Sequence, residues 1–308
     1  MSSDPVASRT MGQRWRWMRL LLRSLLGPFG AWGRWTICIA VGLTLVLTLF
    51  TQVGGLLLWP FWYSITKTAA RFPRWKRRGL TVLWCCVVYL VGGLVIVPQI
   101  AQYSGRVRLP LYATQALPTG PLHIGYALLL RNYVQPHTYA AYTESVLRFQ
   151  KDHPGVTVRY LDAGFVFPTL PLLPHLSHSD GQKIDVAFLF MEDGVYVDRA
   201  RSPIGYWGYA KESPERSECT GVTQKLGPLS IPLRWDFDAL QPFWPELHLD
   251  VAKNRALFRA FAADPRVCSI LLEPGLHTPL RAPKLTKNSC AVARHDDHFH
   301  LTTSQSCR

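Results

Sequence analysis

The stretch HLSHSDGQKIDVAFLF, residues 175–190, contains the residues that decide the fold. Its second half, Ile184–Phe190, is apolar at nearly every position, which is typical of a strand buried on both faces. Asp185 is the second residue of that strand, and an ionised carboxylate there is costly unless it is paired or binds a metal. Asp180-Gly181 predicts a turn just before the strand. His178, which enters the turn, and Asp185 can therefore converge on one point.

A second cluster of histidines lies near the C-terminus, in the sequence HDDHFH from His295 to His300. The run HFHLT predicts a short strand on which His298 and His300 face the same side, while Phe299 faces the opposite side and packs into the core. Two histidines and one carboxylate, drawn from the two clusters, would leave a zinc ion one open position for water. That arrangement is the catalytic one and differs from closed structural zinc sites.

The segments around these clusters predict an α+β domain with a small antiparallel sheet that carries the His/Asp/His site. Apolar residues recur at helical spacing in Tyr139–Lys151, and a second helix is predicted around Leu249–Ala263. Further strands are predicted at Val156–Asp162 and Val267–Leu272. The order of helices and strands favours antiparallel pairing over a wound parallel sheet. The sequence contains no phosphate-binding glycine loop and no Gly-x-Ser-x-Gly elbow.

Basic residues gather at the N-terminal end of the chain. Residues 1–100 contain twelve lysines and arginines but only one acid, and the rest of the chain is nearly neutral. The basic residues flank two apolar stretches, Thr36–Ile65 and Thr81–Pro98, and a membrane-spanning helix needs about 20 apolar residues. We therefore expect contact with membrane lipid and no binding of nucleic acid. We expect N-terminal transmembrane helices before the α+β domain: a basic arm at 1–35, a membrane region at 36–100 with two apolar segments and a basic loop, and then the domain with the zinc site at 101–308.

The basic segments predict conflicting membrane topologies. Both the N-terminal arm and the loop Lys67–Arg78 are basic, and positive loops favour the cytoplasmic side. If the loop dominates, the second apolar segment delivers everything after about residue 100 to the exterior. The first segment, in which Gly54-Gly55 and Trp59-Pro60 allow a break or a tilt, is then either a re-entrant hairpin or a span that opposes the charge rule. The sequence leaves both alternatives open.

Cysteine positions favour the exterior location. Three cysteines lie inside the apolar segments, where a thiol behaves as a small hydrophobe, and four follow residue 100. An even number in an exported domain suggests two disulfides, with three possible connectivities. The alternative is four reduced thiols in a cytoplasmic domain. The late cysteines are Cys219, Cys268, Cys290 and Cys307, and the early ones are Cys38, Cys85 and Cys86.

The two histidine motifs together resemble the paired signatures of the LAS metallopeptidases, in which a histidine, six residues and an aspartate precede a distant His-x-His. The doubled His-x-x-His start and the terminal His-x-x-His-x-His are similar, within that group, to penicillin-insensitive murein endopeptidases. Residues 256–276 are also similar to the segment before that family's last motif. The resemblance covers residues 130–302 and excludes the membrane segments. It implies that His178, Asp185 and His300 bind zinc, that His298 and His295 are catalytic, and that His175 is an extra histidine near the metal.

The resemblance further implies a zinc metallopeptidase that hydrolyses the peptide cross-links of peptidoglycan. Together with the apolar segments and the basic loop, it leads us to expect a chain anchored in the bacterial inner membrane, with its catalytic domain on the periplasmic or outer side. His298 is expected to act as general base and His295 as a transition-state donor, while Asp297 is a rival base. Asp236 and Asp238 are candidate partners of the site, although a solvated turn explains them as well. Three alternatives remain open: a carboxypeptidase or dipeptidase of the same site class, a zinc-retaining binding domain, and a membrane structural protein with a degenerate site.

Overall fold

The computed structural model describes residues 34–58, 72–168, 176–212, 223–226, 229–232, 237–287 and 294–307. The chain divides into two compact units, Met1–Ile96 and Val97–Arg308. All described residues of the candidate site belong to the second unit.

The first expected apolar segment is broken in the structure. Helix α2 (Arg34–Thr51) ends where Gln52 takes a positive φ of 65°, a conformation that is uncommon outside glycine and incompatible with a continuing helix. Helical backbone resumes at Gly54 and continues to Leu58. The apolar helix Val41–Thr51 is shorter than a membrane span requires.

The second expected segment forms a longer helix. Helices α4 (Arg74–Val91), η3 (Gly92–Ile96, a π-helical turn) and α5 (Val97–Tyr103) follow one another without interruption. Within the described residues, Gly79–Tyr103 is the one helix whose 25 residues are long and apolar enough to cross a membrane, by length and composition. The expectation of N-terminal transmembrane helices, in the plural, is therefore not borne out within the described residues, which contain one candidate helix. The end of the first segment, from Trp59 onward, lies outside the described residues.

A six-stranded sheet with the order β12-β11-β13-β5-β4-β2 forms the centre of the second unit. Its four inner strands pair antiparallel, as expected. Both edge strands pair parallel instead, because a long connection joins each of them to its neighbour, and such a crossover permits parallel pairing. The bounds are β2 (Thr119–Pro121), β4 (Val158–Tyr160), β5 (Lys183–Ala187), β11 (Val267–Leu272), β12 (Leu285–Lys287) and β13 (His298–Thr303).

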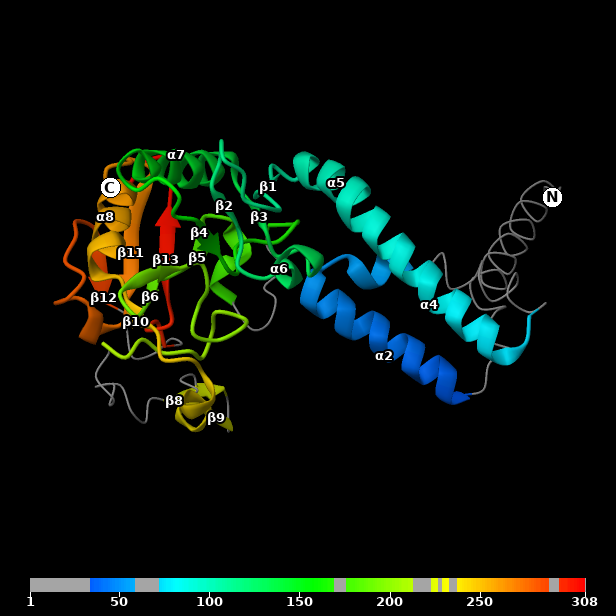
Figure 1. Cartoon of the computed structure of the whole chain (residues 1–308). Coiled ribbons are helices and arrows are strands. Elements are labelled where there is room, and N and C mark those ends of the chain that lie inside the picture. Colours follow the sequence, from blue (N-terminus) through cyan, green and yellow to red (C-terminus); the bar gives the residue numbers. More distant parts are fainter. Residues whose placement is uncertain are drawn as a thin grey trace, which may run out of the picture. The chain divides into compact units, whose positions relative to one another are not determined.

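Two helices cover one face of this sheet. Helix α7 (Pro136–Asp152) packs against α8 (Val251–Ala262), and the two helices contact β13 and β11 respectively (Figure 1). Phe258 and Phe261 of α8 meet Phe299 of β13 with ring centroids 4.8 and 5.9 Å apart, and all three side chains are fully buried. The expectation that Phe299 faces the core is confirmed.

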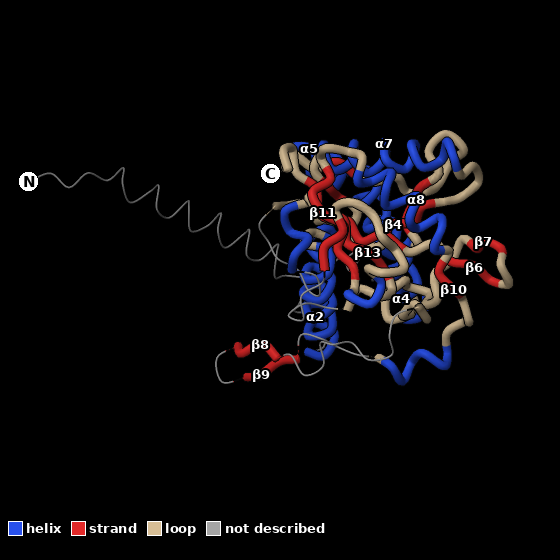
Figure 2. Tube along the Cα trace, turned by 90° about the vertical axis from the view of Figure 1, so that its left-hand side faces the viewer, coloured by secondary structure: helices blue, strands red, loops and turns tan. Residues whose placement is uncertain are grey.

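The sequence predicts one strand over the apolar run Ile184–Phe190. In the structure this run is instead divided between two sheets. Strand β5 ends at Ala187, and β6 (Phe190–Glu192) pairs with β7 and β10 in a separate small sheet (Figure 2). The division occurs at Leu189, whose backbone N–H and carbonyl both bond to the Asn254 side chain of α8, at 3.0 and 2.8 Å.

The remaining strands and helices are β1 (Val107–Arg108), α6 (Ile124–Leu128), β3 (Tyr133–Val134), η4 (Leu176–Asp180), β7 (Val195–Val197), β8 (Thr223–Leu226), β9 (Leu229–Pro232), η5 (Asp238–Phe243), β10 (His248–Leu249) and η6 (Pro274–Leu276).

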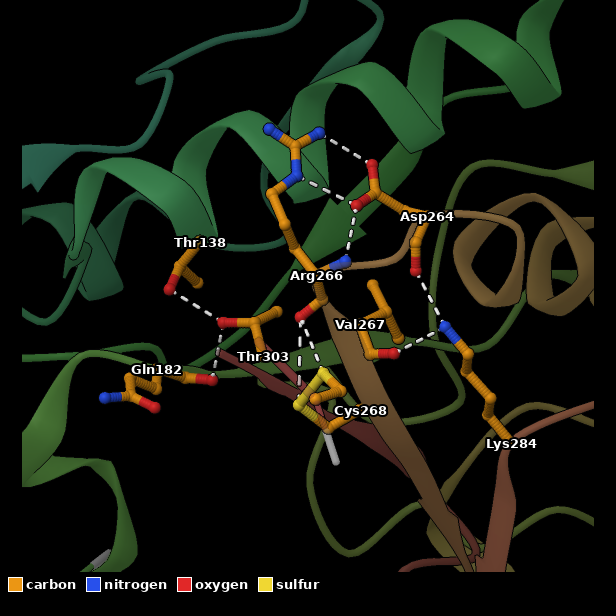
Figure 3. The surroundings of a disulfide bond; sticks show 9 residues. Thr138, Gln182, Asp264, Arg266, Val267, Cys268, Lys284 and Thr303 are labelled. Carbon is orange, nitrogen blue, oxygen red and sulfur yellow. Dashed lines mark hydrogen bonds and ion pairs between the residues drawn. A yellow bond between two sulfur atoms is a disulfide. The ribbon is translucent and has the colours of Figure 1, made fainter. Parts of the chain in front are cut away.

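The end of β13 is held by a covalent bond and by hydrogen bonds (Figure 3). A disulfide joins Cys268 of β11 to Cys307, 39 residues apart, and closing a loop of that length stabilises a fold by about 4 kcal/mol in the chain-entropy estimate. The Thr303 hydroxyl contacts the Thr138 hydroxyl of α7 at 2.7 Å and donates to the Gln182 carbonyl. The strand that carries His298 and His300 is therefore fixed at its C-terminal end. Cys219 and Cys290 lie outside the described residues.

Candidate metal centre

His178, Asp185 and His300 come together in the structure. One ligand atom of each lies within 4.8 Å of the others, and all three side chains are buried. Asp185 of β5 and His300 of β13 are direct partners in the antiparallel register, so their side chains emerge on the same face of the sheet. His178 comes from η4, just before β5. This group could hold a metal ion.

The turn between His178 and the strand depends on Gly181. This glycine has a φ of 68°, and a Cβ there would meet the Arg106 guanidinium at 1.2 Å. Arg106 is itself buried and donates to the carbonyls of Ser179, at 2.8 Å, and Asp180. A residue with a side chain at 181 would displace Arg106, so the glycine is needed to bring the histidine over the sheet.

The hydrogen bonds of the three residues fit a bound cation. Nδ1 of His178 lies 2.6 Å from the Ala163 carbonyl, which only accepts, so Nδ1 carries a proton and Nε2 is the ring nitrogen left to bind a metal. That Nε2 lies 3.3 Å from Oδ1 of Asp185, and Nδ1 of His300 lies 2.7 Å from the same oxygen. An imidazole acceptor facing a carboxylate oxygen is favourable when a positive charge lies between them. Donor atoms on one tetrahedral zinc would be roughly 3.3 Å apart.

Burial also affects the protonation of His300. It lowers the pKa of the imidazole, although the neighbouring Asp185 carboxylate opposes that effect. The ring is therefore biased towards its neutral form, which is the form that binds a metal.

The second oxygen of Asp185 has a partner that the sequence did not indicate. Oδ2 accepts a hydrogen bond from the Tyr206 hydroxyl at 2.7 Å. Burial, and then the charge of Asp185, raise the pKa of Tyr206 well above its usual value, so the hydroxyl keeps its proton and donates. Tyr206 lies in the loop SPIGYWGYA, which matches no motif and has no regular spacing from the histidines. No sequence signal could have identified it.

His298 forms an oriented pair with Asp297. Nδ1 of His298 lies 2.5 Å from Oδ1 of Asp297, so the ring donates there and presents Nε2 as an acceptor. Nε2 in turn lies 3.6 Å from Oδ2 of Asp185, beside the candidate metal ligands. Asp297, the rival base, is buried and also accepts the backbone N–H of Trp207. These contacts suit an orienting role for Asp297 better than proton transfer to substrate.

His295 completes the C-terminal cluster. Its ring centroid lies 4.8 Å from that of His298 and 5.8 Å from that of His300, and its backbone N–H donates to Glu273 at 3.2 Å. The residue is 7% exposed. The structure thus brings His295, His298 and His300 together with His178 and Asp185, whereas His175 lies outside the described residues.

A buried ion pair braces the loop before β13. Arg294 donates to Asp296 at 2.6 Å, and its guanidinium lies over the Tyr209 ring, 3.7 Å from the centroid. Burial raises the pKa of Asp296 to about 6, against the lowering effect of Arg294. Asp238 contacts Arg294 at 3.2 Å and not the histidines. Asp236 lies outside the described residues.

The other five histidines occupy surface or packing positions. His123 caps α6, His153 stacks on Phe149 and His248 faces Glu212. His277 contacts a backbone carbonyl through Nε2 at 3.1 Å, and His137 lies in the first turn of α7.

Comparisons with protein-family models and with curated proteins found no relative of this chain. No protein-family model matches the chain, and no curated protein matches it at a significant level. The likeness of the two histidine motifs to the LAS metallopeptidases stays a prediction, and the assignment of a metal site rests on the geometry of His178, Asp185 and His300.

Proposed function

We propose that this chain is a membrane-anchored zinc metallopeptidase that hydrolyses the peptide cross-links of peptidoglycan. The observation that carries the proposal is the convergence of His178, Asp185 and His300 beside the oriented pair His298–Asp297. Two histidines and a carboxylate are the ligand set of hydrolytic zinc sites with an open position. The resemblance of both motifs to murein endopeptidases supports the substrate class.

The residues around the site have distinct tasks in amide hydrolysis. A bound zinc ion would supply Lewis-acid chemistry, polarising the substrate carbonyl and lowering the pKa of water to about 7. His298 accepts the proton of the attacking water at Nε2, because Asp297 holds the proton on Nδ1. The same imidazole then protonates the leaving amine. His295, next to His298, donates a hydrogen bond to the developing oxyanion.

Digestion of defined muropeptides tests the proposed reaction. The purified full-length chain, in detergent and loaded with zinc, is incubated separately with cross-linked dimers and linear monomers, and the products are measured by mass spectrometry. We expect dimers to be converted to monomers, this conversion to stop after chelation, and zinc to restore it.

Two other outcomes would contradict the proposed reaction. Loss of a terminal residue from monomers, with dimers intact, would identify a carboxypeptidase. Intact substrates in the presence of fully zinc-loaded protein would favour a binding domain without turnover.

We also propose that Gly79–Tyr103 crosses the membrane and places the residues that follow Tyr103 outside the cytoplasm. The helix has the required length and apolarity, and the basic residues of Lys67–Arg78 precede it, which favours a cytoplasmic start. The disulfide Cys268–Cys307 is consistent with an oxidising compartment, because cytosolic thiols are kept reduced. An exterior domain tethered to the inner membrane would have access to the cell wall.

A reporter fusion and thiol labelling test this topology. A reporter that is active only outside the cytoplasm, fused after Arg308, should be active. Cys268 and Cys307 should resist thiol labelling in cells until a reductant is added, and peptide mapping can follow Cys219 and Cys290 in the same sample. An inactive reporter together with four readily labelled late cysteines would place the domain in the cytoplasm and remove the cell wall as substrate.

A further inference from the structure

The dipeptide Tyr206-Trp207 lies between the two carboxylates of the candidate site. The Tyr206 hydroxyl donates to Oδ2 of Asp185 at 2.7 Å, and the next backbone N–H, that of Trp207, donates to Oδ2 of Asp297. One carboxylate belongs to the candidate metal ligands and the other orients His298. A single turn of the loop therefore contacts both parts of the site.

Tyr206 is fixed by a closed ring of hydrogen bonds. Its oxygen accepts the backbone N–H of Asp162 at 3.3 Å, and the carbonyl of Asp162 accepts the backbone N–H of Asp185 at 2.8 Å. The hydroxyl of Tyr206 closes the ring by donating to the Asp185 side chain. The tyrosine ring also lies edge-on to His298, with centroids 4.8 Å apart. One phenol group thus bonds directly to the carboxylate of Asp185 and is linked to its backbone through Asp162.

Trp207 keeps this loop in a strained conformation. Its φ is 64°, which is a genuine outlier for a bulky side chain and persists only when surrounding contacts hold it. Those contacts are present: the carbonyl of Trp207 accepts from Gln241 at 2.7 Å and from the Trp244 indole at 2.9 Å, while its N–H binds Asp297. Such strain is concentrated at functional sites.

We propose that Tyr206 is a positioning residue of the metal centre, which holds Asp185 so that Oδ1 faces His178 and His300, and that the strained Trp207 backbone holds Tyr206 in place. The inference rests on the proposed function for the identity of the metal. Hydrogen bonds to the unused oxygen of a ligating carboxylate orient that ligand, and loss of such a partner costs about 10–100-fold in metal affinity.

The test compares Tyr206→Phe with the matched control Tyr196→Phe. The Tyr196 hydroxyl also donates one hydrogen bond, to the Thr157 carbonyl at 3.0 Å, and accepts the N–H of Thr157 at 3.2 Å, but it does not contact the site. Each substitution removes one phenol oxygen and keeps the ring. Zinc affinity is measured by competition with a chromophoric chelator, and Co²⁺-loaded proteins are compared by visible absorption.

We expect Tyr206→Phe to bind zinc about 10–100-fold more weakly than the wild-type chain and to change the Co²⁺ spectrum. Tyr196→Phe should match the wild type in both, while the thermal midpoints of the two metal-free variants should be similar. Equal zinc affinities and spectra for Tyr206→Phe and the wild type would overturn the positioning role alone. A wild-type chain that binds neither ion would overturn the proposed function as well.

Discussion

Alanine in place of His178, Asp185 or His300 should abolish stoichiometric zinc binding. Each substitution removes one of three converging donors, and two remaining protein donors hold zinc far more weakly than three because the site loses both charge and geometry. Zinc content per chain after dialysis against a weak chelator measures the effect. We expect about one zinc in the wild type and close to none in each variant.

His277→Ala is the matched control, because His277 also contacts a backbone carbonyl through a ring nitrogen but is not one of the converging donors. It should keep the wild-type zinc content. Full occupancy in all three ligand variants would refute the assignment of these residues. Loss in His277→Ala as well would mean that the metal responds to general destabilisation and not to the donors.

The second large effect is expected for His298→Ala, which should keep zinc and lose at least about a hundredfold in hydrolysis, the usual effect of a lost general base. His298 lies beside the ligand set without belonging to it: its Nε2 is 3.6 Å from Asp185 and its Nδ1 is held by Asp297. Turnover of cross-linked dimers at saturating zinc measures the loss, and zinc content is determined in the same preparation.

Two further variants locate the proton transfer if this expectation fails. Near wild-type turnover by His298→Ala would assign the base to Asp297 or His295, and Asp297→Asn and His295→Ala then distinguish them. If His298 is the base, Asp297→Asn should lower turnover without removing zinc, because an amide in place of the carboxylate no longer stabilises the imidazolium that forms.

The sheet face that carries the site was predictable because it follows from the alternation of neighbouring residues along one strand. In HFHLT, strict alternation places His298 and His300 on one side and Phe299 on the other, and the structure confirms this arrangement. Strand β11 has the predicted bounds Val267–Leu272. The convergence of His178 with Asp185 followed from a turn that contains Asp180-Gly181, and Gly181 has the positive φ that such a turn requires.

The parts that could not be predicted depend on contacts between distant segments. The run Ile184–Phe190 is apolar at nearly every position, and the contacts that divide it at Leu189 come from the Asn254 side chain and the Asp250 backbone, far along the chain. The parallel edge strands depend on the path of the long connections. Tyr206 contacts Asp185 through one hydroxyl, from a loop without a motif. None of these contacts has a signature in neighbouring residues.

In the membrane region, composition alone overestimates the number of membrane-spanning helices. Thr36–Ile65 is long enough for a span by apolar content, yet the backbone of Gln52 interrupts the helix. Apolar length predicts a span only when the helix is continuous, and Gly79–Tyr103 meets both conditions.

The most direct test of the metal site is anomalous scattering from crystals of the zinc-loaded chain, collected on both sides of the zinc absorption edge. We predict one strong peak within about 2.0–2.2 Å of Nε2 of His178, a carboxylate oxygen of Asp185 and a ring nitrogen of His300. No peak among these three residues, or a peak held by other side chains, would contradict it.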